Sequence, residues 1–301
     1  MIRIGIIGLS VHSEDYTRII NWQPEGKKGC RVTMLHHPPG NPDVEFREEL
    51  LTRFSRTVQD HGVKIVGSTE EMLPHVDCVM LLTNDGRPHL REIRPVLEAG
   101  KPVYVDKPMA ESLKNVVAIF AEAEKLRVPV FTSSPLRYMR SAQLLAEGAA
   151  GRVLSAHTYG PAPIQPAHAD LFWDGIHGVE LLFTVMGPGC KSVTRIFTQD
   201  TDVVTGVWQD GRTGVFRGQR AGRIGFGGTV FGSDDVKEIG KFDGYEGLVD
   251  SILTFFQTGN PPVTPKQSIE IYAFMHAADI SRARGGIMVD IETELKNALK
   301  G

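Results

Sequence analysis

Short apolar runs alternate with longer stretches of helical spacing through the first part of the chain. The apolar runs occupy residues 2–7, 31–35, 63–66, 78–83, 101–106 and 128–131. The stretches of helical spacing between them cover residues 14–21, 43–61, 88–99 and 112–126. Alternation of this kind predicts parallel strands joined by right-handed helical crossovers. We therefore expect an α/β fold that begins with a doubly wound parallel sheet, covered by helices on both faces.

The second part of the chain has a different pattern. After a helix near residues 142–147, strand-like segments follow at hairpin spacing, with turn signals at Asp210-Gly211 and Gly227-Gly228. These segments are residues 153–159, 191–198, 203–208, 213–218 and 223–229. Helices at 174–186, 245–258 and 267–284 are expected to cover one face of their sheet. We predict two domains, residues 1–134 and 135–301, the second an α+β domain built on a mostly antiparallel sheet.

Charge and cysteine content narrow the possible partners and the compartment. The 33 basic and 36 acidic residues give a net charge of −3 without a basic stripe, so a nucleic-acid partner is not expected. Cys30, Cys78 and Cys190 form no Cys-x-x-Cys pair, which indicates buried thiols in a reducing compartment and argues against a zinc site. No apolar run reaches membrane-helix length, and we expect a cytoplasmic protein with no bound metal.

The loop after the first strand carries candidate phosphate contacts. Its sequence, Gly8-Leu9-Ser10-Val11-His12-Ser13, lies between a strand and a helix, as a dinucleotide-binding turn requires. Only Gly8 of the three expected glycines is present, with Ser10 and Ser13 in the other two places. A serine hydroxyl can donate to a phosphate and also cap the helix. We take Gly8, Ser10, His12 and Ser13 as candidates, the alternative being an ordinary turn with a serine cap.

The second strand ends without the acidic residue that commonly holds the adenosine ribose of NAD. His36 and His37 stand there instead, directly before Pro38-Pro39. Without that carboxylate, the usual repulsion of a 2′-phosphate is absent, which slightly favours NADP as the cofactor. However, no arginine follows to hold the 2′-phosphate. The choice between NAD and NADP stays open, with His36 a cofactor candidate, and both histidines are more simply explained as surface loop residues.

Two further motifs place chemically active side chains where a ligand is expected. Asp106-Lys107-Pro108 follows the fifth strand, where Lys107 would point into a cleft at the carboxyl ends of the parallel strands. In the second domain His177 comes three residues after Asp174, a spacing that would put both on one helix face. A lysine and a histidine across a cleft form an electrophile and acid/base pair. Taken singly, each is more often a loop or core residue.

These motifs together resemble the glucose-fructose oxidoreductase and inositol dehydrogenase family, also called Gfo/Idh/MocA. The resemblance covers nearly the whole chain and rests on the following matches: Gly100-Lys101-Pro102-Val103, Asp106-Lys107-Pro108, Arg137-Tyr138, Gly175-x-His177 and Glu180. The family's Thr-Pro-Asn-x-x-His is rearranged into Thr83-Asn84-Asp85-Gly86-Arg87-Pro88-His89. Trp173 stands where the family has an aspartate, with Asp174 one position later.

The resemblance implies hydride transfer between NAD or NADP and a sugar, cyclitol or related polyol. Residues 1–134 would form a Rossmann dinucleotide-binding domain and 135–301 a substrate-binding and oligomerisation domain. His177 would be the base, Lys107 would hold the substrate oxygen, and Asp174 would orient them. The implied cofactor contacts include Thr83, Asn84, Asp106, Lys107 and Pro108. Arg137 and Tyr138 would contact the substrate or the cofactor, a structural role being an equal alternative. Trp173 would offer a sugar-stacking face, although an aromatic residue beside a helix start is more often part of a core.

Two alternatives remain open at the level of the sequence. A close variant uses the cofactor transiently, in epimerisation or glycoside cleavage without net redox change. From a different class comes a ligand-binding or regulatory protein that kept the fold and lost the dinucleotide, as the serines in the glycine turn suggest. In either case, one uncovered face of the second sheet would suit a homo-oligomer, a dimer or a tetramer.

Overall fold

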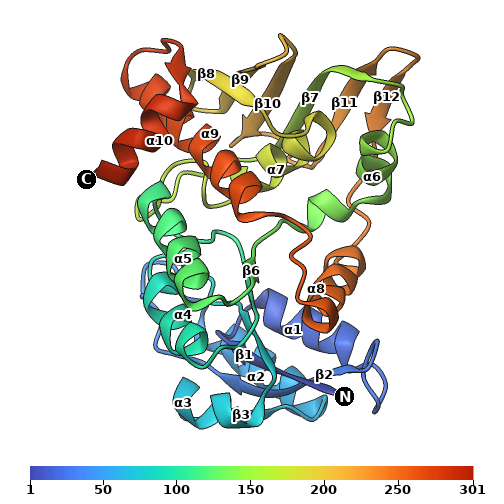
Figure 1. Ribbon diagram of the computed structural model, residues 1–301, viewed down its shortest axis with the longest axis vertical. Coiled ribbons are helices and arrows are strands. Elements are labelled where there is room, and N and C mark those ends of the chain that lie inside the picture. Colours follow the sequence, from blue (N-terminus) through green and yellow to red (C-terminus); the bar gives the residue numbers. More distant parts are fainter. Residues whose placement is uncertain (301) are drawn as a thin grey trace. The chain divides into compact units, whose positions relative to one another are not determined.

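The computed structural model describes residues 1–300 and divides the chain into two compact units (Figure 1). The first unit comprises Met1–Ala110, Ala118–Thr132 and Tyr245–Pro265. The second comprises Glu111–Val117, Ser133–Gly244 and the residues from Lys266 onward. Each unit is therefore assembled from separate stretches of the chain. No helix within the described residues combines the length and apolar composition that a membrane span requires.

A six-stranded parallel sheet forms the centre of the first unit. Its strand order is β3-β2-β1-β4-β5-β6, which confirms the predicted doubly wound sheet. The strands are β1 (Ile2–Ile7), β2 (Cys30–His36), β3 (Lys64–Val66), β4 (Cys78–Leu81), β5 (Val103–Val105) and β6 (Val130–Phe131). Because β1 pairs with both β2 and β4, the strand order reverses at β1, where a nucleotide crevice forms in such sheets.

Most helices of the first unit connect these strands. They are α1 (Val11–Ile20), α2 (Glu48–Asp60), α3 (Thr69–Met72), the 3₁₀ turn η1 (Leu73–His75), α4 (His89–Glu98) and α5 (Leu113–Leu126), whose first residues, up to Val117, are counted with the second unit. Gly100 has a φ of 65° and its N–H donates to the Leu97 carbonyl, which confirms the expected glycine cap after α4. We expected α2 to begin at residue 43, but it begins at Glu48 because residues 41–45 form an irregular loop after two prolines.

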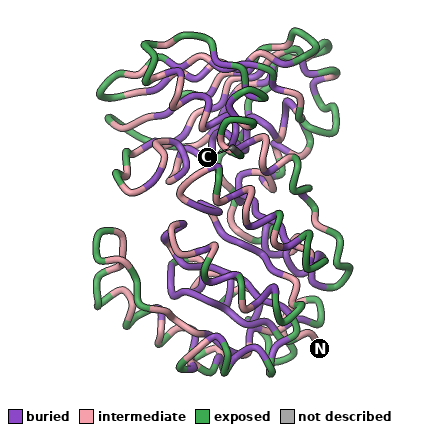
Figure 2. The backbone as a smooth tube through the Cα atoms, turned by 60° about the vertical axis from the view of Figure 1, so that its left-hand side comes forward, coloured by how far each residue is buried: buried purple, intermediate pink, exposed green. Residues whose placement is uncertain are grey.

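The core of the first unit lies along its strands. Figure 2 shows much of the centre of this unit buried, and every residue of β4 is buried. Two of the three cysteines, Cys30 and Cys78, lie in this core, and the third, Cys190, is buried in the second unit. All three are free thiols, as predicted from their spacing. Burial raises the pKa of Cys78 well above that of an ordinary thiol, so it is a packing residue.

The second unit contains a seven-stranded sheet of order β12-β11-β7-β10-β9-β8-β13. Its strands are β7 (Val153–Pro161), β8 (Cys190–Phe197), β9 (Thr201–Trp208), β10 (Thr213–Gln219), β11 (Gly227–Gly232), β12 (Val236–Ile239) and β13 (Val289–Asp290). Every pairing is antiparallel except that of β7 with β10. The predicted mostly antiparallel sheet is therefore confirmed, and its edge strands β12 and β13 were missed because both are short.

Helices pack against one face of the second sheet, as expected (Figure 1). They include α6 (Arg140–Ala146), α7 (Gly175–Met186), α9 (Pro265–Ala283) and α10 (Ile291–Lys300). The helix α8 (Glu246–Thr258), which we expected on this face, belongs instead to the first unit and contacts α1. The sequence pattern of α8 shows that it buries one face, but not which sheet or helix receives that face.

Candidate functional site

The turn after β1 depends on Gly8. Its φ is 96°, in the left-handed region, and a Cβ there would lie 2.3 Å from the backbone nitrogen of Thr83. A hydrogen bond connects the carboxyl ends of β1 and β4 beside this glycine: the N–H of Leu82 donates to the Ile7 carbonyl at 2.7 Å. Only glycine fits between these two strand ends. Gly8 therefore sets the backbone at the point where the strand order reverses.

Ser10 and Ser13 replace the other glycines by forming a capping box at the start of α1. The Ser13 hydroxyl accepts the Ser10 N–H at 2.7 Å, and Ser10 accepts the Ser13 N–H at 3.3 Å. Ser13 is fully buried, so it shapes the turn from beneath. Within residues 1–300, the amides of Val11 and His12 have no hydrogen-bond acceptor. Two such donors at the positive end of a helix suit the anionic pyrophosphate of a dinucleotide.

His12 links this turn to the loop after β5. Its Nδ1 lies 2.5 Å from a carboxylate oxygen of Asp106, whose other oxygen accepts the Tyr104 hydroxyl at 3.2 Å. The His12 ring stacks on Tyr16 with 5.2 Å between centroids. Burial alone would raise the pKa of Asp106, but His12 and Lys107 together hold it below its ordinary value. Asp106 is thus an ionised group committed to positioning the glycine turn.

Lys107 follows directly, partly exposed, at the carboxyl end of β5. The Lys107–Pro108 peptide bond is cis. One residue beyond Pro108, the Met109 carbonyl lies 3.1 Å from Nδ1 of His89, whose Nε2 lies 2.9 Å from the Thr83 carbonyl. His89 therefore fastens the Lys107 loop to the loop after β4, even though the motif that contains it is rearranged.

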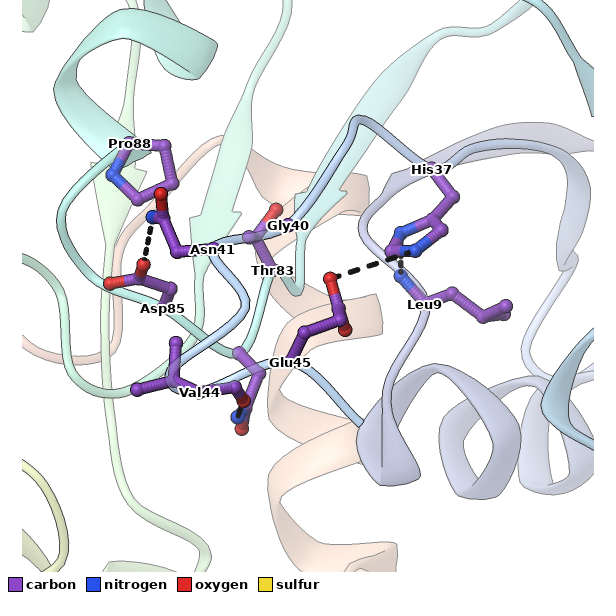
Figure 3. Close-up of a pocket in the computed structure, with 10 residues that line it drawn as sticks. Leu9, His37, Gly40, Asn41, Val44, Glu45, Thr83, Asp85 and Pro88 are labelled. Atoms are coloured by element: carbon purple, nitrogen blue, oxygen red, sulfur yellow. Dashed lines mark hydrogen bonds and ion pairs between the residues drawn. The ribbon is translucent and has the colours of Figure 1, made fainter. Parts of the chain in front are cut away.

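A small pocket lies beside Gly8, at the carboxyl ends of the strands (Figure 3). Its lining residues come from the turn after β1 and from the loops after β2 and β4: Leu9, His37, Gly40, Asn41, Val44, Glu45, Thr83, Asn84, Asp85 and Pro88. Its free volume is about 10 Å³, enough for one water molecule. Nδ1 of His37 accepts the Leu9 N–H at 3.2 Å, so His37 is a fixed part of this pocket and not the surface residue we expected.

Of the remaining candidates, Thr83 and Asn84 line the same pocket, whereas His36 does not. His36 turns toward β3, where its Nδ1 donates to the Val66 carbonyl at 3.3 Å. The Thr83 hydroxyl donates to Glu92 at 2.7 Å, and the Asn84 side chain donates to the Val44 carbonyl at 3.2 Å. Of the two adjacent histidines, His37 and not His36 therefore faces the pocket.

In the second unit His177 lies in the first turn of α7. It is only 8% exposed, and its Nδ1 is 2.7 Å from the hydroxyl oxygen of Ser134. The same hydroxyl accepts the Leu136 N–H at 3.2 Å. The Phe226 ring packs edge-on against the imidazole with 5.7 Å between centroids. These contacts fix the ring plane and assign Nδ1 to Ser134.

Glu180, one turn later on α7, holds the segment that carries Ser134. Its carboxylate accepts the Ser133 hydroxyl at 2.5 Å, the Ser134 N–H at 2.8 Å and Nε of Arg137 at 2.7 Å. Glu180 is 4% exposed. Arg137 is therefore an ion-pair partner within the 3₁₀ turn η2 (Pro135–Tyr138). The Glu180 carboxylate positions Ser134, and through it His177.

Asp174 differs from the sequence prediction. We expected Asp174 on one helix face with His177, but Asp174 is the N-cap residue of α7, and its carbonyl accepts the His177 N–H at 3.1 Å. The glycine at position 175 begins the helix one residue later than the pattern indicated. Trp173 is half-buried, and its ring lies 4.9 Å from that of His168. Tyr138, at the end of η2, is also half-buried.

Sequence reasoning missed Ser133, Ser134, Glu45 and Asp85 as parts of these clusters. The two serines come two and three residues after the end of β6, so a rule that inspects the carboxyl end of every parallel strand would have found them. No comparable signal marks Glu45, because its position depends on how an irregular loop folds.

The strand order, the glycine turn and the donor-rich start of α1 define a dinucleotide-binding α/β fold. Residues 2–134 match the family model GFO_IDH_MocA, described as an oxidoreductase family with an NAD-binding Rossmann fold. This part of the chain therefore matches the family that its motifs resemble.

Curated relatives of similar sequence are inositol dehydrogenases. The chain is 25% identical to inositol 2-dehydrogenase 3 of Saccharopolyspora erythraea over 171 residues, which is 55% of this chain and 46% of that enzyme. It is 30% identical to inositol 2-dehydrogenase of Rhodococcus erythropolis over 173 residues, again 55% of this chain and 46% of the relative. The matched stretch thus spans about half the length of these relatives.

Solved structures share the whole fold. A putative myo-inositol dehydrogenase from Sinorhizobium meliloti superposes with a TM-score of 0.79 at 14% identity, over 97% of this chain and 100% of that one. Scyllo-inositol dehydrogenase from Lactobacillus casei, solved with NAD(H) and scyllo-inositol, gives 0.76 at 13% identity, over 97% and 99%. At these identities the likeness establishes the fold.

Proposed function

We propose that the chain is an NAD(P)-dependent oxidoreductase that transfers hydride between a nicotinamide cofactor and a cyclitol, sugar or related polyol. The observation that carries the proposal is Lys107 at the carboxyl end of β5, in a sheet whose residues match an NAD-binding oxidoreductase family. The inositol dehydrogenases among the relatives favour a cyclitol or similar polyol as substrate. The first unit binds the dinucleotide in this proposal, and residues from 135 onward supply the substrate contacts, including Tyr138 and Trp173.

His177 takes the hydroxyl proton of the substrate. The Ser134 hydroxyl beside its Nδ1 can both donate and accept, so it remains a partner of the imidazole before and after Nε2 gains a proton. With Nδ1 and the ring plane fixed, the proton is taken at Nε2. Asp174 contributes through its backbone carbonyl, which anchors the turn of α7 that carries His177.

Lys107 holds the substrate oxygen and stabilises the negative charge that develops there as the proton leaves. A preorganised ammonium is well suited to this because it needs no rearrangement during the reaction. A bound nicotinamide cofactor supplies the hydride acceptor. The α1 amides of Val11 and His12 would hold the pyrophosphate, with Gly8 and Ser10 shaping the turn beneath it.

A titration with both reduced cofactors tests this function. The fluorescence of NADH or NADPH should change saturably as the purified protein is added, and a polyol screen with the oxidised cofactor should yield reduced nicotinamide. Titration with AMP alone is the control, because it carries the adenosine without the reacting ring. Absence of binding by either dinucleotide would contradict the proposal.

The same titration tests a second candidate function, that of a ligand-binding or regulatory protein that no longer binds a dinucleotide. One observation favours it: the pocket beside Gly8 has only about 10 Å³ of free volume and is closed by contacts between its own loops. If that closure is permanent, neither cofactor binds. If it opens, the oxidoreductase is supported.

The exposed face of the second sheet is proposed to form a homo-oligomer, a dimer or a tetramer. Side chains that alternate with the buried ones along the strands lie on this face, and the large apolar ones among them include Ile196, which is 63% exposed, and Phe231, which is 43% exposed. Apolar side chains exposed on a sheet face can contribute to a subunit interface. Because β8 and β11 lie on opposite sides of the sheet, the two residues span its width.

We expect the double substitution Ile196→Glu and Phe231→Glu to reduce the molecular mass in solution, measured by light scattering after gel filtration, to that of one chain. The charges would have to be buried unpaired in the interface. Met288→Glu, at a residue 66% exposed and outside the sheet, is the matched control and should leave the mass unchanged. An unchanged mass in the double variant would exclude this face as the interface. The three buried thiols agree with a cytoplasmic location for the assembly.

A further inference from the structure

The loop between β2 and α2, residues 37–47, is fastened over the ends of β1 and β4. The Asn84 amide donates to the Val44 carbonyl at 3.2 Å, and the Asn41 amide donates to Asp85. Arg87 bridges Asp43, at 2.6 Å, and Asp85, at 2.9 Å. These contacts bring a loop that begins after β2 to the crevice where the strand order reverses.

Glu45 is the part of this loop that takes the place of an acid at the end of β2. Its Oε2 lies 3.9 Å from Nε2 of His37, the residue directly after β2. Its Oε1 accepts the Phe46 N–H at 3.0 Å, which orients the carboxylate. A Cβ on Gly40 would lie 1.4 Å from Oε2, so only a glycine at position 40 leaves room for the carboxylate here.

The charges around this carboxylate disfavour a second phosphate. Two of the residues that line the pocket, Glu45 and Asp85, carry carboxylates, and within the described chain no lysine or arginine lines it. The neighbouring Arg87 is already held between Asp43 and Asp85. Burial lowers the pKa of His37, so its imidazole is uncharged at neutral pH and, with Nδ1 accepting from Leu9, presents an N–H on Nε2.

Resting on the proposed function, we propose that Glu45 accepts the hydroxyl groups of the adenosine ribose and makes the chain specific for NAD over NADP. A carboxylate accepts hydrogen bonds from a ribose diol and repels a 2′-phosphate. Asn41 and Asp85 lie on the opposite side of the pocket from His37 and Leu9 (Figure 3). Their contact would have to open for the adenine ring to enter. The slight preference for NADP inferred from the two histidines is thereby reversed, since the acid is supplied from the loop and not from the strand.

The experiment compares the dissociation constants of NADH and NADPH, measured by fluorescence titration, in the wild type and in Glu45→Gln. The wild type should bind NADH more tightly. Loss of a charged acceptor should weaken NADH binding by about tenfold, and loss of the repulsion should tighten NADPH binding, so the preference falls. Glu49→Gln, an exposed residue in the first turn of α2, makes the same charge change as a control and should leave both constants unaltered.

Glu45→Asp separates charge from reach, because it keeps the carboxylate but withdraws it by one carbon. We expect weaker NADH binding without any gain for NADPH. Thermal unfolding of each variant establishes whether it is folded. If Glu45→Gln is not folded, Glu45→Asp is used to test the inference. A wild type that binds NADPH more tightly, or a preference unchanged in both Glu45 variants, would overturn the inference and leave the proposed function standing. A wild type that binds neither nucleotide removes the proposed function itself.

Discussion

Replacing His177 with asparagine is expected to lower kcat for polyol oxidation by about 10² to 10⁴, the usual contribution of a general base. Asparagine can still bond to the Ser134 hydroxyl, so the fold of the first turn of α7 should be kept. The dissociation constant of NADH should not change, because the proposed cofactor contacts all lie in the first unit. Steady-state kinetics and fluorescence titration measure the two effects separately.

Lys107→Met should reduce kcat to a similar extent, since methionine keeps the length of the side chain and removes only the ammonium. Two matched controls should retain activity. They are His157→Asn, on strand β7, and Lys101→Met, just before β5. Unchanged turnover in both His177→Asn and Lys107→Met would remove these two residues from the reaction. A KM effect alone would indicate that they bind substrate without assisting the chemistry.

Glu180→Ala is expected to lower the free energy of unfolding by about 3–5 kcal/mol, the typical cost of removing one partner from a buried ion pair. Arg137, with a side chain 15% exposed, would keep an unpaired charge, and the Ser133 hydroxyl and Ser134 N–H would lose their acceptor. Urea unfolding measures this loss. Glu238→Ala, an exposed glutamate on β12, is the control and should change stability little.

Glu180→Gln distinguishes positioning from stability. It keeps an acceptor oxygen for the Ser134 N–H while removing the charge that pairs with Arg137. If Glu180 acts on catalysis by placing Ser134 beside His177, a folded Gln variant should lose kcat and retain its KM. A folded variant with unaltered kcat would limit Glu180 to a structural role.

The architecture was predictable because hydrophobic periodicity records which residues face a core. Short apolar runs bounded by turn signals, such as 78–83, favour buried strands, and their alternation with helices predicts a parallel sheet. The same information does not specify tertiary partners. The apolar face of α8 is visible in the sequence, but its packing against α1, far away along the chain, is not. Short edge strands such as β12 carry too little pattern to be detected.

The candidate site was only partly predictable, for a related reason. Lys107 and His177 occur in motifs whose place in the fold follows from a strand end or a helix start. Glu45 gains its place only when the loop after β2 folds back over β4, through contacts such as Asn84 with Val44. The displacement of Asp174 to a helix cap follows from a single-residue difference in where α7 begins, which periodicity does not resolve.

The discontinuous make-up of the first unit bears on how it can be isolated. A fragment ending after β6 would contain the entire parallel sheet but lack Tyr245–Pro265, including α8, and the apolar side of α1 that α8 covers would then meet solvent. A soluble stand-alone nucleotide-binding module would need that segment grafted back through a short linker. Exchange of the first unit between proteins during evolution would likewise require the transfer of more than one gene segment, because the unit is built from separate stretches of the chain.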